Sequence, residues 1–437
     1  MDSKQDNPEE HESKPFVPSP DPQPSPIDKD TEPDGGSGSN EAEIVTPESA
    51  ARRPRRPGRI AGRVALALVS VVALAASGYA YVTKDHLQSN VHTTDALTLP
   101  GEPSPPTDDG GTDILLVGSD ARTDAQGNPL PARLLKALRT EDKAGVNTDT
   151  IIVLRIPKKG GKPSGISIPR DAWVDVPGRG KAKINSAYGV AKANFAAQKR
   201  REGNTDEAAI ERDSDQAGRK ALVQTVQDFT QLRIDHYAEV NLLGFYLLTE
   251  ALGGVTVCLN HPTSDSDSGA NFRAGAQTVS GGEALSFVRQ RKNLPRGDLD
   301  RIVRQQSFLS SALHQVLSAG TLTSPSTLGH LMDAVHRSIV ADPGLDLLDF
   351  ANQVKGIASS DMSFVTIPVV NINGRSEDGQ QSIVEVDPVA VRQFIAGLVG
   401  RSEPPAPASA NAGAGGGGSS GGTPVRESGS AEVACVN

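Results

Sequence analysis

Short runs of β-branched and other apolar residues alternate with longer segments in which apolar positions recur every three to four residues. The short runs are typical of strands and the longer pattern is typical of amphipathic helices. Because this alternation is characteristic of a sheet flanked by helices, the pattern predicts an α/β fold. The predicted strands span 113–117, 150–156, 165–169, 236–241 and 364–368, and the predicted helices span 217–232, 242–252, 282–287, 300–319, 345–357 and 388–398.

One apolar run near the start differs from the rest in its length. Residues 64–82 contain no charge and directly follow six arginines within residues 52–63. As a helix, this run would be roughly 28 Å long, close to the ~30 Å hydrocarbon core of a bilayer. We therefore predict a transmembrane helix over 64–82 with a basic juxtamembrane segment over 52–63. Because such flanks stay in the cytoplasm, the protein is expected in the cell membrane as a single-pass chain with a cytoplasmic N-terminus.

Both ends of the chain have low-complexity composition. Residues 1–50 carry thirteen Asp or Glu, three Lys and nine Pro but one aromatic residue, so we predict a disordered acidic tail over 1–51. A Pro/Thr/Asp-rich stretch over 83–111 predicts an extracytoplasmic stalk, and a Gly/Ser/Pro-rich stretch over 402–437 predicts a disordered tail. The folded domain is thus expected over 112–401.

Charge is distributed unevenly along the chain. The net charge is −9, and the acidic tail accounts for it, so the remainder is nearly neutral. A nucleic-acid-binding domain needs a basic face, and the predicted domain also lies beyond the membrane. We therefore expect no nucleic-acid partner.

The chain has two cysteines. Cys258 lies in the apolar run Val255–Leu259, and Cys435 lies near the end. An oxidising exterior would allow a Cys258–Cys435 disulfide. The alternative is a small buried thiol at Cys258 and an unpaired tail thiol at Cys435, and the sequence leaves both open.

Two carboxylates stand at the ends of predicted strands. Asp120 follows the first strand within Gly118–Arg122, and Asp149 comes just before the second within Asn147–Thr150. If the strands are neighbours, the two side chains could hold a hard cation such as Mg²⁺ together with water. Taken alone, Asp and Asn at such places are ordinary turn and cap residues.

Arginines recur at similar places. Arg170 directly follows the third strand, and Arg289 and Arg291 stand two apart, a spacing that places both on one side of an extended chain. Arg301 and Gln305 share one face of the helix predicted over 300–319. Forked guanidinium groups suit the oxygens of a pyrophosphate, although any one arginine alone is more often a surface residue.

Several sequence blocks between residues 114 and 309, in order and spacing, resemble the LytR-CpsA-Psr (LCP) family. They include ILLVGSDAR, NTDTIIVLRIP, ISIPRDAWVDVPG, KINSAYG, SGGEALSFVRQRK and GDLDRIVRQQSFL. The resemblance implies a three-layer α/β/α domain with a mixed central sheet, anchored by one N-terminal transmembrane helix. It also implies a tunnel for a polyprenyl tail, and a phosphotransferase that moves a phosphate-linked glycopolymer from a polyprenyl-pyrophosphate carrier to peptidoglycan.

The family's motif positions imply roles for individual residues. The implied catalytic residues are Asp149, Arg170, Arg289, Arg291 and Arg301; the substrate-binding residues are Arg122, Asn147, Asp171, Arg304 and Gln305; and Asp120 and Asp149 are the ligands of Mg²⁺ or Mn²⁺. Two departures weaken the transfer. Asn147 stands where many members have an arginine, a loss for which Arg122 could compensate, and residues 126–146 form a longer spacer between the two carboxylates.

Two other functions remain compatible with these residues. Water could replace the sugar hydroxyl, which would make the protein a polyprenyl-pyrophosphate hydrolase. Alternatively, the domain could be a non-catalytic membrane-bound regulator that binds lipid-linked glycan. The sequence determines neither the glycopolymer nor the oligomeric state, and it leaves Asp149 and Asp171 as alternative proton acceptors.

Overall fold

A seven-stranded sheet forms the centre of the computed structural model, which describes residues 92–99, 105, 110–124, 127–140, 146–158, 162–317, 324–346, 362–400 and 434–437. Parallel and antiparallel ladders both occur, since β2 pairs antiparallel with β3 and parallel with β7. The predictions of an α/β fold and a mixed central sheet are confirmed. In sheet order the strands are β1 (His92–Thr93), β12 (Ile339–Ala341), β7 (His236–Val240), β2 (Gly111–Ser119), β3 (Thr148–Pro157), β4 (Ser164–Ser167) and β13 (Ser363–Thr366).

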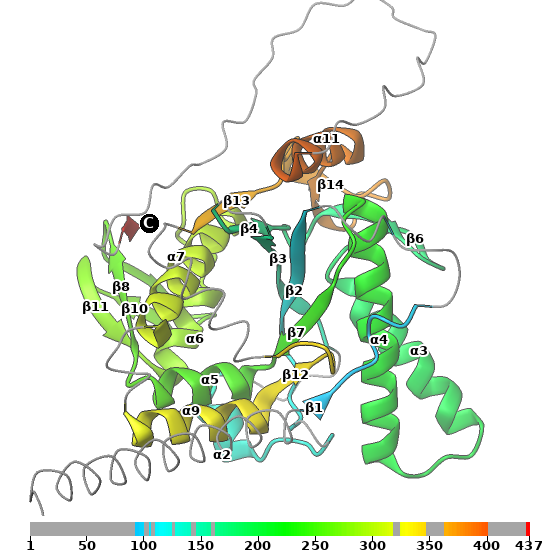
Figure 1. Ribbon diagram of the computed structural model, residues 1–437, viewed down its shortest axis with the longest axis horizontal. Helices are drawn as coiled ribbons and strands as arrows, with labels where there is room; N and C mark the ends of the chain where they lie inside the picture. The colour runs from blue at the N-terminus through cyan, green and yellow to red at the C-terminus, as the bar shows by residue number, and fades with distance from the viewer. Residues whose placement is uncertain are drawn as a thin grey trace, which may run out of the picture. The chain divides into compact units, whose positions relative to one another are not determined.

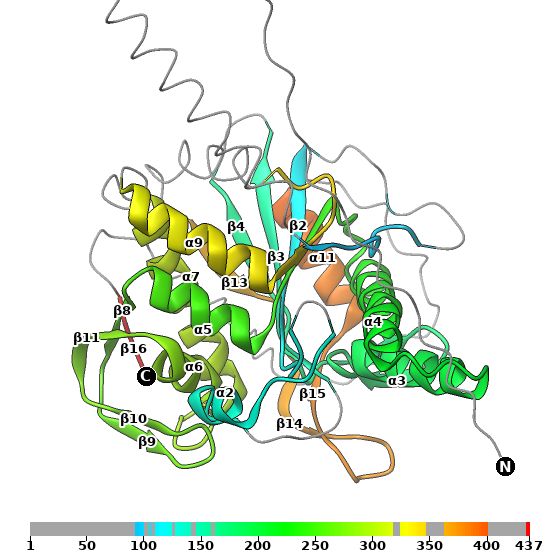
Figure 2. The same cartoon turned by 90° about the horizontal axis from the view of Figure 1, so that it is seen from below.

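Helices lie on both sides of this sheet, with α3 and α4 on one side and α5 and α9 on the other (Figures 1 and 2). The sequence sets their ends locally. Asp206 caps α4 by accepting a hydrogen bond from Ala209 N, and Asn241 caps α5 in the same way through Gly244 N. The helices are α2 (Ala132–Ala137), α3 (Ser186–Arg201), α4 (Glu207–Thr230), α5 (Leu242–Ala251), α6 (Gly281–Arg289), α7 (Asp298–Leu317), α9 (Pro325–Ser338) and α11 (Pro388–Val399).

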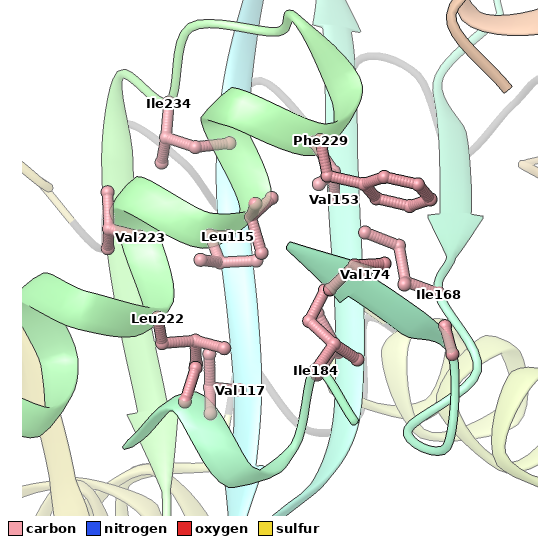
Figure 3. Packing of buried hydrophobic residues seen from close by; sticks show 14 of the residues in the cluster. Leu115, Val117, Val153, Ile168, Val174, Ile184, Leu222, Val223, Phe229 and Ile234 are labelled. Carbon is pink, nitrogen blue, oxygen red and sulfur yellow. The ribbon is translucent and has the colours of Figure 1, made fainter. Parts of the chain in front are cut away.

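The main core lies between the sheet and α4 (Figure 3). Alternate residues of β2, including Leu115 and Val117, point toward Leu222 and Phe229 of α4. Their neighbours on the strand, such as Ile114, join a second cluster on the opposite face. Because successive strand residues point to opposite faces, β2 is apolar on both sides, as a central strand must be. This packing holds the ends of β2 and β3 in place.

A smaller sheet lies beside α6 and α7 and contains β11 (Gly275–Val279), β8 (Val255–Leu259) and β16 (Cys435–Val436). β16 pairs parallel with β8, and Cys435 is disulfide-bonded to Cys258. The expectation of a disordered tail is therefore wrong for residues 434–437. The remaining strands form three two-stranded ribbons: β5 (Trp173–Val176) with β6 (Gly180–Lys183), β9 (Thr263–Asp265) with β10 (Ala270–Phe272), and β14 (Asn371–Arg375) with β15 (Ser382–Glu385).

The predicted stalk also contains ordered chain. β1 pairs parallel with β12, Ala96 is fully buried, and Lys220 of α4 forms an ion pair with Asp95. Residues 92–99 thus belong to the folded part, and the stalk prediction is wrong for them.

Several other predictions lie outside the described residues: the acidic tail over 1–51, the arginine-rich segment over 52–63, the membrane span over 64–82, and nearly all of the helix over 345–357. Within the described parts of the chain, no helix is both long and apolar enough to cross a bilayer.

Candidate functional site

The ends of β2 and β3 bring Asp120 and Asp149 together. Antiparallel pairing of these strands sets the end of β2 beside the start of β3, with an irregularity at Gly118 and Ser119. Asp120 N donates to the carbonyl of Asn147 at 3.0 Å, and Asn147 N donates to the Asp120 carboxylate at 2.6 Å. Asp120 and Asp149 therefore lie close together, although residues 126–146 form a long spacer between them in the sequence.

Two arginines from different elements hold Asp149. Nη1 of Arg170, which follows β4, lies 2.6 Å from its carboxylate, and Nη2 of Arg301 on α7 donates to its carbonyl oxygen at 3.1 Å. Burial by itself would raise the pKa of Asp149, but the charges of Arg170 and Arg301 outweigh it, so the pKa lies below its ordinary value. Asp149 is therefore ionised at neutral pH.

Arg301 is deeply buried, with a side chain 2% exposed. Burial, followed by repulsion from Arg170, lowers its pKa to about 10. Asp298, in the first turn of α7, lies 3.2 Å from Arg301 Nη2 and 3.5 Å from Arg170 Nε. Among the described residues, the Nε atoms of both arginines have no hydrogen-bond acceptor, and neither carboxylate oxygen of Asp298 has a donor.

Asp298 was not predicted as a site residue. Its place in the first helical turn, three residues before Arg301 within GDLDR, was the available signal. Acidic residues in the first turn of a helix usually interact with the helix dipole, so this position alone did not indicate that Asp298 contacts Arg170 and Arg301.

Asp120 is partly buried, and this burial raises its pKa, as does the negative charge of Asp149. Arg122 offsets part of the effect, with Nη2 at 3.7 Å from the carboxylate. The Asn147 contacts hold Asp120 toward the same end of the sheet. Arg122 and Asn147 thus lie in this group of residues.

Arg289 approaches the carboxylates from the end of α6. Its Nη1 lies 3.5 Å from the carbonyl of Leu138 and 3.4 Å from that of Arg139. Burial lowers the pKa of Arg289, while Asp149 and Asp120 oppose this shift, so its charge faces both carboxylates.

Arg289 and Arg291 do not lie in an extended chain, so the prediction that they point to one side of such a chain is wrong. Arg289 is the last helical residue of α6, and Gln290 leaves the helix. Arg289 is half-buried at the site, whereas Arg291 is exposed. The charge of Arg291 nevertheless contributes to lowering the pKa of Arg301.

Asp171 reaches the cluster at its margin. Its Oδ2 lies 3.6 Å from Arg170 Nε, and its Oδ1 lies 3.1 Å from Nζ of Lys183 on β6. Lys183 was not predicted, because nothing local in the sequence shows that the β5–β6 ribbon folds back on Asp171.

Gln305 and Arg304 diverge from the predicted arrangement. Gln305 Nε2 donates to the carbonyl of Val288 at 3.2 Å, which ties α7 to α6 close to Arg289. Arg304 is fully buried and hydrogen-bonds to Gln290 and to the main-chain oxygen of Asn437. It does not join the Asp149 cluster, since β16 and α6 supply its partners.

Residues 71–393 match the model of the LytR_cpsA_psr family. The chain belongs to this family. The cell wall biosynthesis protein LcpA of Corynebacterium glutamicum is 44% identical over 365 residues, which cover 83% of this chain and 70% of that protein. A teichoic acid transferase named TagU from Oceanobacillus iheyensis is 35% identical over 201 residues, or 46% of this chain and 55% of that relative.

Solved structures of LCP proteins are more distant in sequence. A LytR-Csp2A-Psr enzyme from Actinomyces oris has 17% identity and a TM-score of 0.47, covering 71% of this chain and 97% of that one. TagT bound to LI-WTA has 19% identity and a TM-score of 0.45, covering 69% and 98%. Membership of the family is therefore shown by the sequence match and not by these structures.

The LCP motif residues of this chain supply a partial set of cation ligands. Among the described residues, no group of three or more His, Cys, Asp or Glu could hold a metal ion. Mg²⁺ is usually held by one or two carboxylates, with water and phosphate oxygens as the other ligands. Asp120 and Asp149, adjacent and repelling each other, fit that requirement once a phosphate is present.

Proposed function

We propose that this LCP protein transfers a phosphate-linked glycopolymer from a polyprenyl-pyrophosphate carrier to peptidoglycan. Its relatives are named for cell wall biosynthesis and for teichoic acid transfer to peptidoglycan. Which glycopolymer this chain transfers is left to experiment. The predicted span over 64–82 would place the described domain outside the cell, where peptidoglycan lies.

One observation carries the assignment. Arg170, Arg289 and Arg301 converge on Asp149. The buried Nε atoms of Arg170 and Arg301 form no hydrogen bond within the described chain, although Arg170 Nε lies 3.5 Å from Asp298. An unsatisfied buried donor costs about 1–3 kcal/mol, so a protein retains it where a ligand supplies the acceptor. A pyrophosphate offers several charged oxygens and matches forked donors on different elements.

The proposed reaction replaces a phosphoanhydride bond by a phosphate ester bond. A hydroxyl oxygen of a peptidoglycan sugar bonds to the glycan-side phosphorus, and the bond from that phosphorus to the bridging oxygen breaks. Polyprenyl phosphate leaves, and the hydroxyl proton passes to solvent or to a carboxylate. The arginines stabilise negative charge that develops on the phosphate oxygens, a contribution of preorganised electrostatics.

Asp149 and Asp171 are the carboxylates placed to receive the proton. The lowered pKa of Asp149 makes it a weak base, and loose phosphoryl-type transition states need little base assistance. Mg²⁺ or Mn²⁺ at Asp120 and Asp149 would neutralise phosphate charge when bound.

The test is transfer by the full chain in detergent with polyprenyl-diphospho-N-acetylglucosamine, Mg²⁺ and peptidoglycan fragments, followed by mass spectrometry. We expect a phosphate-linked adduct on the fragment. Arg289→Ala should lower its rate about 10²–10³-fold, the usual effect of losing one transition-state donor. Arg200→Ala is the matched control, because Arg200 is an exposed residue on α3 that pairs with Glu207.

The other functions give different products. Free glycan phosphate without adduct would identify a hydrolase. Binding of the lipid without any product, equal in wild type and Asp149→Ala, would identify a non-catalytic regulator.

A further inference from the structure

Arg304 is a buried cation outside the Asp149 cluster. Its side chain is fully buried, and its guanidinium lies 5.1 Å from the centre of the Phe287 ring. Asp300 is the acidic group whose charge acts on it, yet Asp300 forms its ion pair with Arg296 at 2.7 Å. Burying a guanidinium without a paired carboxylate costs free energy, so the hydrogen bonds of Arg304 must offset this cost.

Those hydrogen bonds join two segments that are far apart in the sequence. Arg304 Nη1 donates to Gln290 Oε1 at 2.7 Å, and Nε donates to the main-chain oxygen of Asn437. Asn437 directly follows β16, which is linked to β8 through Cys435 and Cys258. Arg304 therefore connects the disulfide-linked terminal strand to Gln290.

Gln290 stands between the two arginines of the Arg289–Arg291 segment. It is fully buried, and its backbone ends α6, so it sets the direction in which the chain continues. Its Nε2 also donates to Thr263 on β9 at 2.5 Å and to the carbonyl of Lys292 at 3.0 Å.

The segment has a second anchor on its outer side. Asn293 Nδ2 donates to the carbonyl of Ser264 on β9 at 2.7 Å, and Lys292 Nζ lies 2.6 Å from Asp267, just after β9. β9 pairs with β10, whose Ala270 and Phe272 are buried in the same cluster as Phe287 of α6. The segment is therefore held from two sides, and Arg304 supplies the connection to α7 and the β11–β8–β16 sheet.

We propose that Arg304 is a positioning residue, through which the disulfide-linked strand β16 holds Gln290 and thereby fixes Arg289 and Arg291 at the site. This inference rests on the proposed function, in which Arg289 contacts the pyrophosphate. Arg304 itself does not touch the substrate. The terminal strand acts on the site by ordering the arginine segment.

The first test is hydrogen–deuterium exchange of the full chain, read on peptides that cover residues 289–294. Arg304→Met and Gln290→Leu should each accelerate exchange there at least about tenfold, because the inner anchor is lost. Gln290→Glu keeps an acceptor for Arg304 but loses the donors to Thr263 and Lys292, so its exchange should lie between that of wild type and that of Gln290→Leu. Arg155→Met removes another buried arginine, paired with Asp113 at the opposite end of β2 and β3, and should leave these peptides unchanged.

The second test is kinetic, with polyprenyl-diphospho-N-acetylglucosamine as the probe. Arg304→Met and Gln290→Leu should lower kcat/KM by about 10- to 100-fold, as for other small displacements of catalytic groups, while Gln290→Glu should lose less than Gln290→Leu. Cys435→Ser should give a smaller loss, and combining it with Arg304→Met should add nothing, since both act through one connection.

These outcomes separate the two proposals. Unchanged exchange at 289–294 in a folded Arg304→Met protein would overturn the positioning role. So would a loss of kcat/KM in Gln290→Glu equal to that in Gln290→Leu. If the wild type gives no transfer but the exchange pattern holds, the proposed function fails while the structural connection through Arg304 stands.

Discussion

Two buried ionic groups flank the central sheet and differ in how their charges are satisfied. Beneath α4, Arg219 pairs with Glu239 at 2.7 Å, and Tyr237 donates to the same carboxylate at 3.0 Å. Although burial opposes its charge, these neighbours raise the pKa of Arg219 well above its ordinary value. At the ends of β2 and β3 the pKa of Arg170 is also raised by its carboxylate neighbours, but burial and Arg170 lower the pKa of Arg301 to about 10.

The difference distinguishes a structural ion pair from a binding site. In the group under α4 the positive charge of Arg219 is favoured by partners within the chain, so removing a partner should destabilise the fold. Around Arg301 burial and the nearby Arg170 disfavour the positive charge although Asp298 lies 3.2 Å away, so removing Arg301 should cost more activity than stability. Strained or unsatisfied sites of this kind commonly exchange stability for function.

The largest expected effect is on the group under α4. Arg219→Met leaves Glu239 buried without its cation and should lower the free energy of unfolding by about 3–5 kcal/mol. Chemical denaturation of the full chain in detergent measures this. Arg219→Met combined with Glu239→Leu should recover most of the loss, and a cost below about 1 kcal/mol for the single variant would break the comparison.

The second effect concerns Arg301. Arg301→Met should reduce transfer about 10²–10³-fold while changing the free energy of unfolding by less than about 1 kcal/mol, because relief from burying the cation offsets the loss of its ion pair with Asp298. Transfer assays and chemical denaturation of the same variant measure the two effects. A destabilisation as large as that of Arg219→Met would show that the two groups do not differ.

Asp120 should give a smaller effect of the same kind. Its folded pKa is raised, so the ionised carboxylate costs stability once the pH exceeds the ordinary value of 3.8. Asp120→Asn should therefore stabilise the chain at pH 7, by less than about 1 kcal/mol, while lowering transfer. The gain should vanish near pH 3, where the wild-type carboxyl is protonated, and a gain that does not depend on pH would contradict the electrostatic origin.

Local patterns predicted the strands that carry the site, because β2, β3 and β4 are apolar runs bounded by turn residues. They did not predict β16, whose two residues follow a Gly/Ser tract and form a strand only by pairing with β8. Nor did they predict the partners of Arg304, a residue to which the family resemblance gives a substrate-binding role. These partners lie 14 and 133 residues away along the chain.

The smallest effect lies at the start of β7, where His236 Nδ1 is 3.1 Å from Asp342. The hydrogen bond to Asp342 raises the pKa of His236 above 6.5, despite partial burial. Burial alone would raise the pKa of Asp342, but His236 and the N–H of Tyr237 lower it below 3.8. A raised histidine pKa stabilises the fold below about pH 6.5 and loses this contribution as the pH rises through the folded value. A lowered aspartate pKa contributes above 3.8 and is lost in acid.

The pair should therefore stabilise most between about pH 4 and 6.5. His236→Gln should lower the free energy of unfolding at pH 5.5 by less than about 1 kcal/mol and leave it nearly unchanged at pH 8.5. Denaturation at the two pH values measures the difference. Because this pair is satisfied within the chain, transfer should be unaffected, and an equal loss at both pH values would assign the effect to packing instead of charge.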